Sequence, residues 1–320
     1  MAKMSGSIDI FATVGTFDGV HRGHLFLLKC LREAAAARGL RPAAIVPVRH
    51  PLSVIRPDAV PLQISTFKDK KRLIEQAGVT VIPLDFTKAL SRLDSAGFLK
   101  LIRDEMGAKG LMTGYDNRFG SDRQHTFHDY VREGDEAGIE VVQAPELKGM
   151  SSSRIRQALM QGDLDAAADM LGRRFSLCGT VVPGQRLGSD IGFATANMQT
   201  EEPGMAIPAR GVYATLAKLT GERSTPWMPA MTNIGYRPTI DKTENRLSIE
   251  THIFGIDTKL YGRGLTLQFV SRLREERKFA SLSELGCQLA KDALSARNAL
   301  ADSGAYAATA TDNTQHKIKI

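Results

Sequence analysis

The chain has 320 residues, of which 42% are hydrophobic and 24% charged, which is ordinary for a globular protein and long enough for two domains. Its net charge is +7, but the basic residues are scattered and aromatic residues make up only 6%, so we expect no nucleic-acid partner. No stretch approaches the ~20 apolar residues that span a bilayer, and the N-terminus lacks the apolar core of a signal peptide. We therefore expect a cytoplasmic protein without a membrane partner.

Three widely spaced cysteines do not indicate a disulfide framework. We expect Cys30, Cys178 and Cys287 to be reduced, buried thiols.

Short apolar runs alternate with helix-like stretches through the first half of the chain. The predicted strands cover 8–14, 43–48, 79–84, 109–113 and 139–144, and the predicted helices 23–38, 67–77, 95–106 and 126–137. Nearly continuous apolar runs are typical of parallel strands buried on both faces. The alternation predicts an α/β domain over 1–172 with a doubly wound, Rossmann-like parallel sheet, whose ligands bind beyond the carboxyl ends of the strands.

The pattern changes near Gly172 to short β-runs separated by glycine and proline. These runs cover 175–182, 211–219, 228–235, 247–254 and 265–273, and one helix follows over 282–300. Several strands with a single helix predict a small β-barrel or sandwich with a closing helix over 173–300. The small, polar residues 301–320 predict a disordered tail.

The segment Thr16–His24, TFDGVHRGH, lies between the first predicted strand and the first predicted helix. Backbone N–H groups at a helix start favour an anion, and His21 and His24 lie three residues apart, on one side of the first turn. Two imidazoles there suit the negative charge of a phosphorus transition state. A histidine pair alone is more often a helix cap or a surface feature, and we expect His125 and His128 to be surface residues. For His21 and His24, the preceding strand, the neighbouring glycines and the following helix favour a catalytic role.

The HxGH spacing resembles the signature of the nucleotidyltransferase superfamily, whose members attack the α-phosphate of a nucleoside triphosphate. The order of motifs over residues 8–298 resembles the bacterial bifunctional riboflavin kinase/FAD synthetase family. This resemblance implies an N-terminal domain that adenylylates FMN to FAD and a C-terminal barrel that phosphorylates riboflavin to FMN. Both steps would use ATP and Mg²⁺, with riboflavin, FMN and ATP as the small-molecule partners. An oligomer is possible, but the sequence does not indicate one.

In the first domain the resemblance assigns catalytic roles to His21, His24 and Arg156, the last in SSSRIR (151–156). An arginine can hold two phosphate oxygens at once. The residues that the resemblance places at the nucleotide or its phosphates are Gly15, Phe17, Asp18, Gly23, Asp116, Ser152 and Ser153. His50 and Pro51 correspond to a pair near the flavin.

In the second domain GFATAN (192–197) resembles a motif in which Thr195 and Asn197 help to hold Mg²⁺, and the hydroxyl and amide oxygens of such residues suit that ion. Further expected positions are Gly184 and Gly192 at the nucleotide, Arg237 of NIGYRPT (233–239) at the flavin, and Glu250 as general base.

In this second domain three residues depart from the family pattern, Leu187, Ser189 and Ala194. They leave open the alternative of an FMN adenylyltransferase with a weakened or inactive kinase domain. A second alternative, of another class, is a non-catalytic flavin-binding regulatory module.

Overall fold

A computed structural model of the chain describes residues 9–115, 118–122, 125–184, 192–220, 226–238, 245–256 and 260–305, with the backbone alone at 237–238 and 245–246. The chain divides into two compact units, Met1–Ser152 and Ser153–Ile320. This division falls at the start of a helix, α6 (Ser152–Gln161), whereas the change in sequence pattern lies near Gly172. Within the described ranges, every helix is too short or too polar to cross a membrane.

The first unit is built on five parallel strands in the order β3-β2-β1-β4-β5. The strands are β1 (Ile10–Val14), β2 (Arg41–Pro47), β3 (Thr80–Leu84), β4 (Ala108–Thr113) and β5 (Glu140–Gln143). The predicted doubly wound parallel sheet is therefore confirmed. After β3 the chain returns to the other side of β1, so the strand order reverses between β1 and β4.

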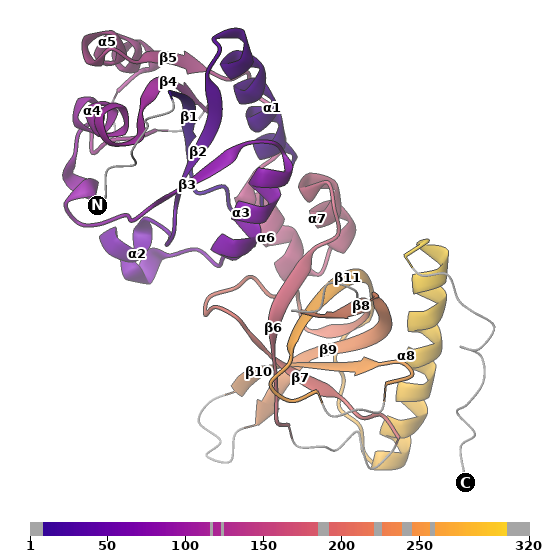
Figure 1. Cartoon of the computed structure of the whole chain (residues 1–320). Helices are drawn as coiled ribbons and strands as arrows, with labels where there is room; N and C mark the ends of the chain where they lie inside the picture. The colour runs from indigo at the N-terminus through magenta and orange to yellow at the C-terminus, as the bar shows by residue number, and fades with distance from the viewer. Residues whose placement is uncertain are drawn as a thin grey trace. The chain divides into compact units, whose positions relative to one another are not determined.

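Helices cover both faces of this sheet (Figure 1). Their bounds are α1 (Arg22–Ala37), α3 (Phe67–Gln76), α4 (Ser95–Met106) and α5 (Phe127–Ala137), with shorter turns at α2 (Leu52–Ile55), η1 (Pro57–Ala59) and η2 (Leu90–Arg92). Successive strand residues point to opposite faces. Phe11 accordingly packs with α1 and α3, while Ile10 and Ala12 pack with α4 and α5.

The second unit contains a closed barrel of antiparallel strands in the order β10-β7-β6-β11-β8-β9. Its strands are β6 (Ser176–Val182), β7 (Ala196–Thr200), β8 (Gly211–Leu219), β9 (Met228–Pro238), β10 (Asn245–Ile253) and β11 (Gly264–Arg274). The barrel, rather than the sandwich, is the form that the β-runs adopt. Besides α6, the helix α7 (Leu164–Leu171) precedes the barrel in this unit.

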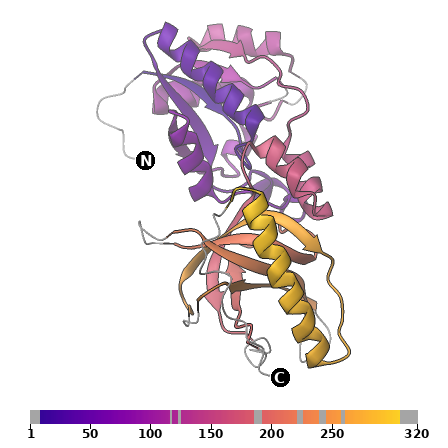
Figure 2. The same ribbon diagram turned by 90° about the vertical axis from the view of Figure 1, so that its right-hand side faces the viewer.

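The last described helix, α8 (Leu282–Asp302), lies against the outside of the barrel and packs on β8, β9 and β11 (Figure 2). It buries Ala296 and Leu300 in a cluster with Phe193 and Phe254. Inside the barrel, three fully buried threonines form a hydrogen-bonded row, with hydroxyl oxygens 2.8 Å apart for Thr215–Thr232 and 3.0 Å for Thr232–Thr251. The predicted tail is described only to residue 305.

The three cysteines are free thiols, as the sequence predicts. The expectation that all are buried is wrong, because Cys287 lies on an exposed part of α8 and the other two are half-buried.

Candidate active sites

The turn after β1 brings His21 and His24 together. His21 is the N-cap of α1, and its Nδ1 accepts a hydrogen bond from the backbone N–H of His24 at 3.3 Å. The two imidazoles stack with their centroids 3.7 Å apart and their planes 16° from parallel. A side chain at Gly23 would come within 3.1 Å of the His21 ring, so glycine permits this close approach. The turn therefore presents two histidines at a helix start, as the sequence predicts.

The backbone of this turn is strained at two buried residues. Phe17 has φ of 47° and Val20 has φ of 39°, in the left-handed region that costs a non-glycine residue about 1–3 kcal/mol. Gly19, between them, adopts φ of 80° without that cost. The Phe17 ring packs 5.1 Å from the His24 ring, centroid to centroid, and a side chain at Gly15 would come within 3.2 Å of Phe17. Such strain persists where surrounding contacts fix the backbone, which is common at functional sites.

Asp18 supplies those contacts. Its buried carboxylate accepts hydrogen bonds from the backbone N–H of Ile64 at 2.9 Å and of Ser65 at 3.2 Å. In return, the Ser65 hydroxyl accepts from the N–H of Gly19 at 2.9 Å, and the Ser152 hydroxyl donates to the Asp18 carbonyl at 2.8 Å. We call these bonds between Asp18, Gly19, Ile64 and Ser65 the Asp18 clamp. Sequence reasoning missed Ile64 and Ser65, which lie 46 and 47 residues from Asp18.

Other predicted residues follow the carboxyl ends of neighbouring strands. His50 lies shortly after β2, and its Nδ1 accepts from the N–H of Leu52 at 3.2 Å, while Pro51 is the N-cap of α2. The sheet order sets the ends of β2, β1 and β4 side by side. Asp116, expected after β4, lies outside the described residues.

The serines and arginine of SSSRIR lie at the start of α6. Arg156 donates from Nη2 to the Ser153 hydroxyl at 3.3 Å. Both residues belong to the second compact unit, whereas the histidines and Ser152 belong to the first. The roles of Arg156 and Ser153 remain predictions.

The barrel aligns a second set of polar residues across three strands. Glu250 on β10 lies opposite Asn197 on β7 and opposite Asn233 on β9. Residues directly opposite one another project to the same side of a sheet. Because the next residue, Thr251, joins the threonine row inside the barrel, Glu250 and its two asparagine neighbours project outward. Sequence reasoning quoted Asn233 within NIGYRPT without assigning it a role, and only the strand register reveals its position beside Glu250.

Several contacts fix this row of Asn197, Glu250 and Asn233, which we call the barrel row. The Ser248 hydroxyl donates a hydrogen bond to Glu250 Oε1 at 3.4 Å. Asn197 is buried, and a Cβ at Gly184 would come within 1.9 Å of its Nδ2, so the absence of a side chain at 184 makes space for this amide. The barrel row thus depends on strand register and on one glycine.

The remaining barrel predictions are less closely defined. Thr195 directly precedes β7 and is half-buried, and Gly192 is exposed with φ of 82°. Arg237 lies on β9, but its side chain is outside the described residues, as are Leu187 and Ser189. The carbonyl of Ala194, a departure from the family pattern, accepts a hydrogen bond from His252 Nδ1 at 2.8 Å.

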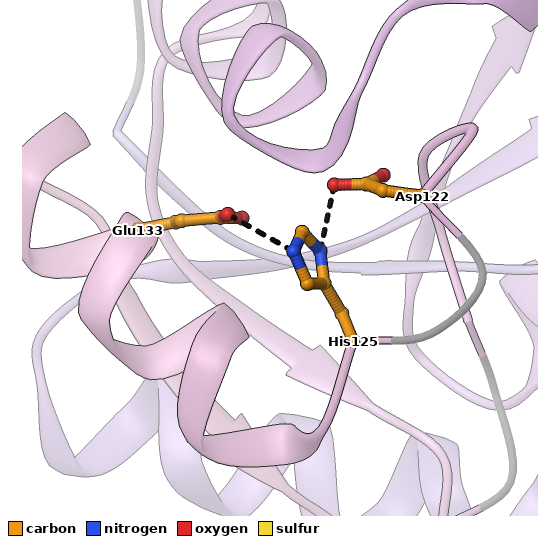
Figure 3. Close-up of side chains that lie close together, drawn as sticks. All are labelled: Asp122, His125 and Glu133. Atoms are coloured by element: carbon orange, nitrogen blue, oxygen red, sulfur yellow. Dashed lines mark ion pairs between the residues drawn. The ribbon is translucent and has the colours of Figure 1, made fainter.

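The second histidine pair differs from our expectation. His128 is exposed, as predicted, but His125 is half-buried and lies between the carboxylates of Asp122 and Glu133, so the expectation for His125 is wrong (Figure 3). The sequence spacing hides this cluster because Glu133 joins it from the second turn of α5.

Comparisons with known proteins match both halves of the chain. A family model described as FAD synthetase matches residues 4–157, and one described as riboflavin kinase matches residues 171–300. A bifunctional riboflavin kinase/FMN adenylyltransferase of Escherichia coli (strain K12) is 34% identical over 291 residues, covering 89% of this chain and 91% of the relative. One of Bacillus subtilis is 32% identical, covering 87% of this chain and 89% of the relative.

A solved structure also resembles the whole chain. The crystal structure of a protein named as a macrolide-efflux protein from Streptococcus pneumoniae is 29% identical, with a TM-score of 0.79 over 92% of this chain and 96% of that one. Both units of the fold therefore occur together in a single solved chain.

Proposed function

The chain belongs to the family of bifunctional riboflavin kinases/FMN adenylyltransferases, and we propose that it converts riboflavin to FMN and FMN to FAD, with ATP as the donor in both reactions. The observation that carries this proposal is the match of two different family models to two successive parts of the chain. Because a riboflavin kinase model matches the chain in addition to an FAD synthetase model, neither the enzyme with a weakened kinase domain nor the non-catalytic flavin-binding module is favoured.

In the first reaction, a phosphate oxygen of FMN attacks the α-phosphorus of ATP and the bond from that phosphorus to the pyrophosphate oxygen breaks. Negative charge builds on the non-bridging oxygens and on pyrophosphate, so positioning and positive electrostatics supply most of the rate. His24, held beside His21 at the start of α1, donates toward these oxygens together with the N–H groups of the first helical turn. His21 positions His24, because its Nδ1 binds the His24 backbone.

In the second reaction, a riboflavin hydroxyl attacks the γ-phosphorus of ATP, ADP leaves, and Glu250 takes the hydroxyl proton. A general base must lie within hydrogen-bond reach of the proton that it accepts. The carboxylate of Glu250 is half-buried and projects on the outer side of the barrel, which is the side from which the riboflavin hydroxyl would approach.

Mg²⁺ is the metal that fits the donor chemistry of Asn197 and Glu250 in the barrel row together with Thr195, which directly precedes β7. Asn197, Thr195 and Glu250 carry amide, hydroxyl and carboxylate oxygens, which are the hard ligands that this ion prefers. Thr195 and Asn197 would hold the ion, and a bound Mg²⁺ would neutralise charge on the ATP phosphates. The residues themselves orient the phosphates and accept the proton.

Product analysis tests both halves of the proposal. The purified full chain receives ATP and Mg²⁺ with either riboflavin or FMN, and flavins are separated by HPLC. We expect FMN and FAD from riboflavin, and FAD with equimolar pyrophosphate from FMN. FAD from FMN but no product from riboflavin would contradict the kinase half, and no product from either flavin would contradict both.

A further inference from the structure

A cluster of metal-ligating side chains lies on the face of the first sheet opposite to α1. Asp122 and His125 come from the loop after β4, Glu133 comes from α5, and Ser95 is the first residue of α4. His125, Asp122 and Glu133 each offer a ligand atom, and these atoms all lie within 4.8 Å of one another. Figure 3 shows the His125 ring between the two carboxylates. Two nearby segments, the loop after β4 and α5, therefore converge with the start of α4, and the largest separation is 38 residues, between Ser95 and Glu133.

The contacts within the cluster are close. His125 Nδ1 lies 2.6 Å from Asp122 Oδ2 and 3.0 Å from the Ser95 hydroxyl, while Nε2 lies 3.7 Å from Glu133 Oε1. The Ser95 hydroxyl also lies 2.6 Å from Asp122 Oδ2 and is hydrogen-bonded to Glu133. Gly120 leaves space for this arrangement, because a Cβ there would come within 2.3 Å of Asp122 Oδ1.

These contacts need more protons than the cluster holds. The fully buried Ser95 hydroxyl carries one hydrogen, yet it faces Asp122 and Glu133, which as carboxylates only accept, and an imidazole nitrogen. A doubly protonated His125 would add two hydrogens. The cluster would then have three hydrogens for the five close contacts among Ser95, Asp122, His125 and Glu133. In the part of the chain that the structure describes, His125 is also the sole ion-pair partner of Asp122 and Glu133. Among the described residues, two carboxylates thus pair with a single imidazole, and a divalent cation would neutralise both of them.

The donor set selects the kind of cation. One imidazole nitrogen with two carboxylate oxygens suits first-row transition ions, whereas Mg²⁺ and Ca²⁺ prefer oxygen ligands alone. Zn²⁺ binds such atoms at about 2.0–2.2 Å, which places neighbouring tetrahedral ligands about 3.4 Å apart. The ligand atoms of the cluster, all within 4.8 Å of one another, are close to that spacing. The buried rings of Phe98, Phe119 and Tyr130 pack on one another, and Tyr130 packs against the His125 ring. These three rings, which we call the aromatic floor, exclude water from one side of the cluster.

Tyr130 belongs to this floor and not to the ligand set. Its hydroxyl donates to the carbonyl of Phe119 at 3.2 Å, and burial raises the pKa of the phenol, which therefore stays neutral.

We propose that Asp122, His125 and Glu133 bind one divalent first-row transition ion of the Zn²⁺ type, with the Ser95 hydroxyl as hydrogen-bond partner of the ligands. The ion ties the loop after β4 to the second turn of α5, and the Ser95 hydroxyl links these ligands to the start of α4. It therefore stabilises the segment that leads out of GYDNRFG. The site is independent of the proposed flavin chemistry, since it rests on other side chains.

Zn²⁺ and Co²⁺ are the probes for the test. The full chain is stripped with a chelator and titrated with Zn²⁺ against a chromophoric competitor, and the visible spectrum of a Co²⁺ sample reports the ligand geometry. We expect one tight equivalent in the wild type and an increase in Tm on adding Zn²⁺. Loss of an outer hydrogen-bond partner already weakens metal sites by about 10- to 100-fold, so His125→Gln and Glu133→Gln should each weaken binding by about 100-fold or more and abolish the Tm increase.

Two further variants separate this site from other histidines. His128→Gln removes an exposed histidine from the same helix start and should bind Zn²⁺ as the wild type does. His24→Gln should also retain the tight equivalent. The chelator-treated variants are first compared with chelator-treated wild type by circular dichroism, and Glu133→Gln serves if His125→Gln does not fold. A wild type without the tight equivalent, equal affinity in the folded ligand variants, or loss of binding in His24→Gln would overturn the proposal.

Discussion

The two candidate active sites are built in contrasting ways. In the first unit, His21 and His24 lie on one turn whose backbone is strained at Phe17 and Val20. In the barrel, Glu250 is set between Asn197 and Asn233 by the pairing of three strands. The first site is therefore held by tertiary contacts to a loop, and the second by the hydrogen-bonded register of the sheet.

This contrast implies different sensitivities to mutation. The turn depends on the Asp18 clamp, so a change at Ser65 can move the histidines without touching substrate. We expect the barrel row to respond less to such remote changes, but a one-residue register slip would turn its side chains to the inside. The strongest tests of this comparison change one site while the other reports that the chain is folded.

The largest effect is expected for Glu250→Gln. The amide keeps the shape of the side chain but cannot accept the hydroxyl proton, so FMN formation should fall by about 100- to 10,000-fold. FAD formation from supplied FMN should be unchanged, as measured by HPLC. The exposed Glu202→Gln serves as a matched control with both activities intact. A parallel fall in both activities would show that the two sites do not act separately.

His24→Gln is the corresponding test of the turn. Loss of one preorganised donor to a developing oxyanion costs about 100- to 1,000-fold, so FAD formation should fall by that factor while riboflavin phosphorylation continues. The matched control is His128→Gln, which removes an exposed imidazole. Unaltered FAD output would remove His24 from the reaction.

Gly184→Ala perturbs the barrel row without removing a functional group. A Cβ at 184 would lie 1.9 Å from Asn197 Nδ2, so the amide must move, and we expect kcat/KM for riboflavin phosphorylation to fall by about tenfold, since small misplacements lower rates strongly. The control Gly286→Ala lies on α8 with no atom within 4 Å of the added carbon. Equal kinase kinetics in the two variants would mean that Asn197 does not need its present position.

The sequence predicts most of the fold because its strands are self-contained apolar runs. The exceptions are elements whose state depends on partners. β7, with the sequence ANMQT, carries a mixed pattern, and pairing with β6 and β10 makes it a strand. α7, with the sequence LDAAADML, is short, and burial of Leu164 and Leu171 supports it within the second unit.

The candidate sites also contain both residues that the sequence predicts and residues that only the folded chain brings together. His21 and His24 are predictable because their spacing fits one helical turn. The partners of Asp18 are not, because they come from the loop before α3, 46 and 47 residues away. Glu133 and Ser95 likewise reach His125 only in the folded chain, because Glu133 lies in the second turn of α5 and Ser95 at the start of α4.

The smallest effect is expected for Ser65→Ala, which removes one bond of the Asp18 clamp. The buried N–H of Gly19 then loses the hydroxyl that accepts its hydrogen bond, at a cost of about 1–3 kcal/mol in the free energy of unfolding of the first unit. Because this bond helps to hold the strained turn, FAD formation should fall several-fold with riboflavin phosphorylation unchanged. Urea unfolding and HPLC measure the two effects. Ser91→Ala, whose hydroxyl donates to the Lys88 carbonyl at 2.9 Å near the surface, should change stability by less than about 0.5 kcal/mol and neither activity. If Ser65→Ala proved as mild as Ser91→Ala, the turn would be stable through its own packing, and the contrast between a clamped loop and a paired sheet would not hold.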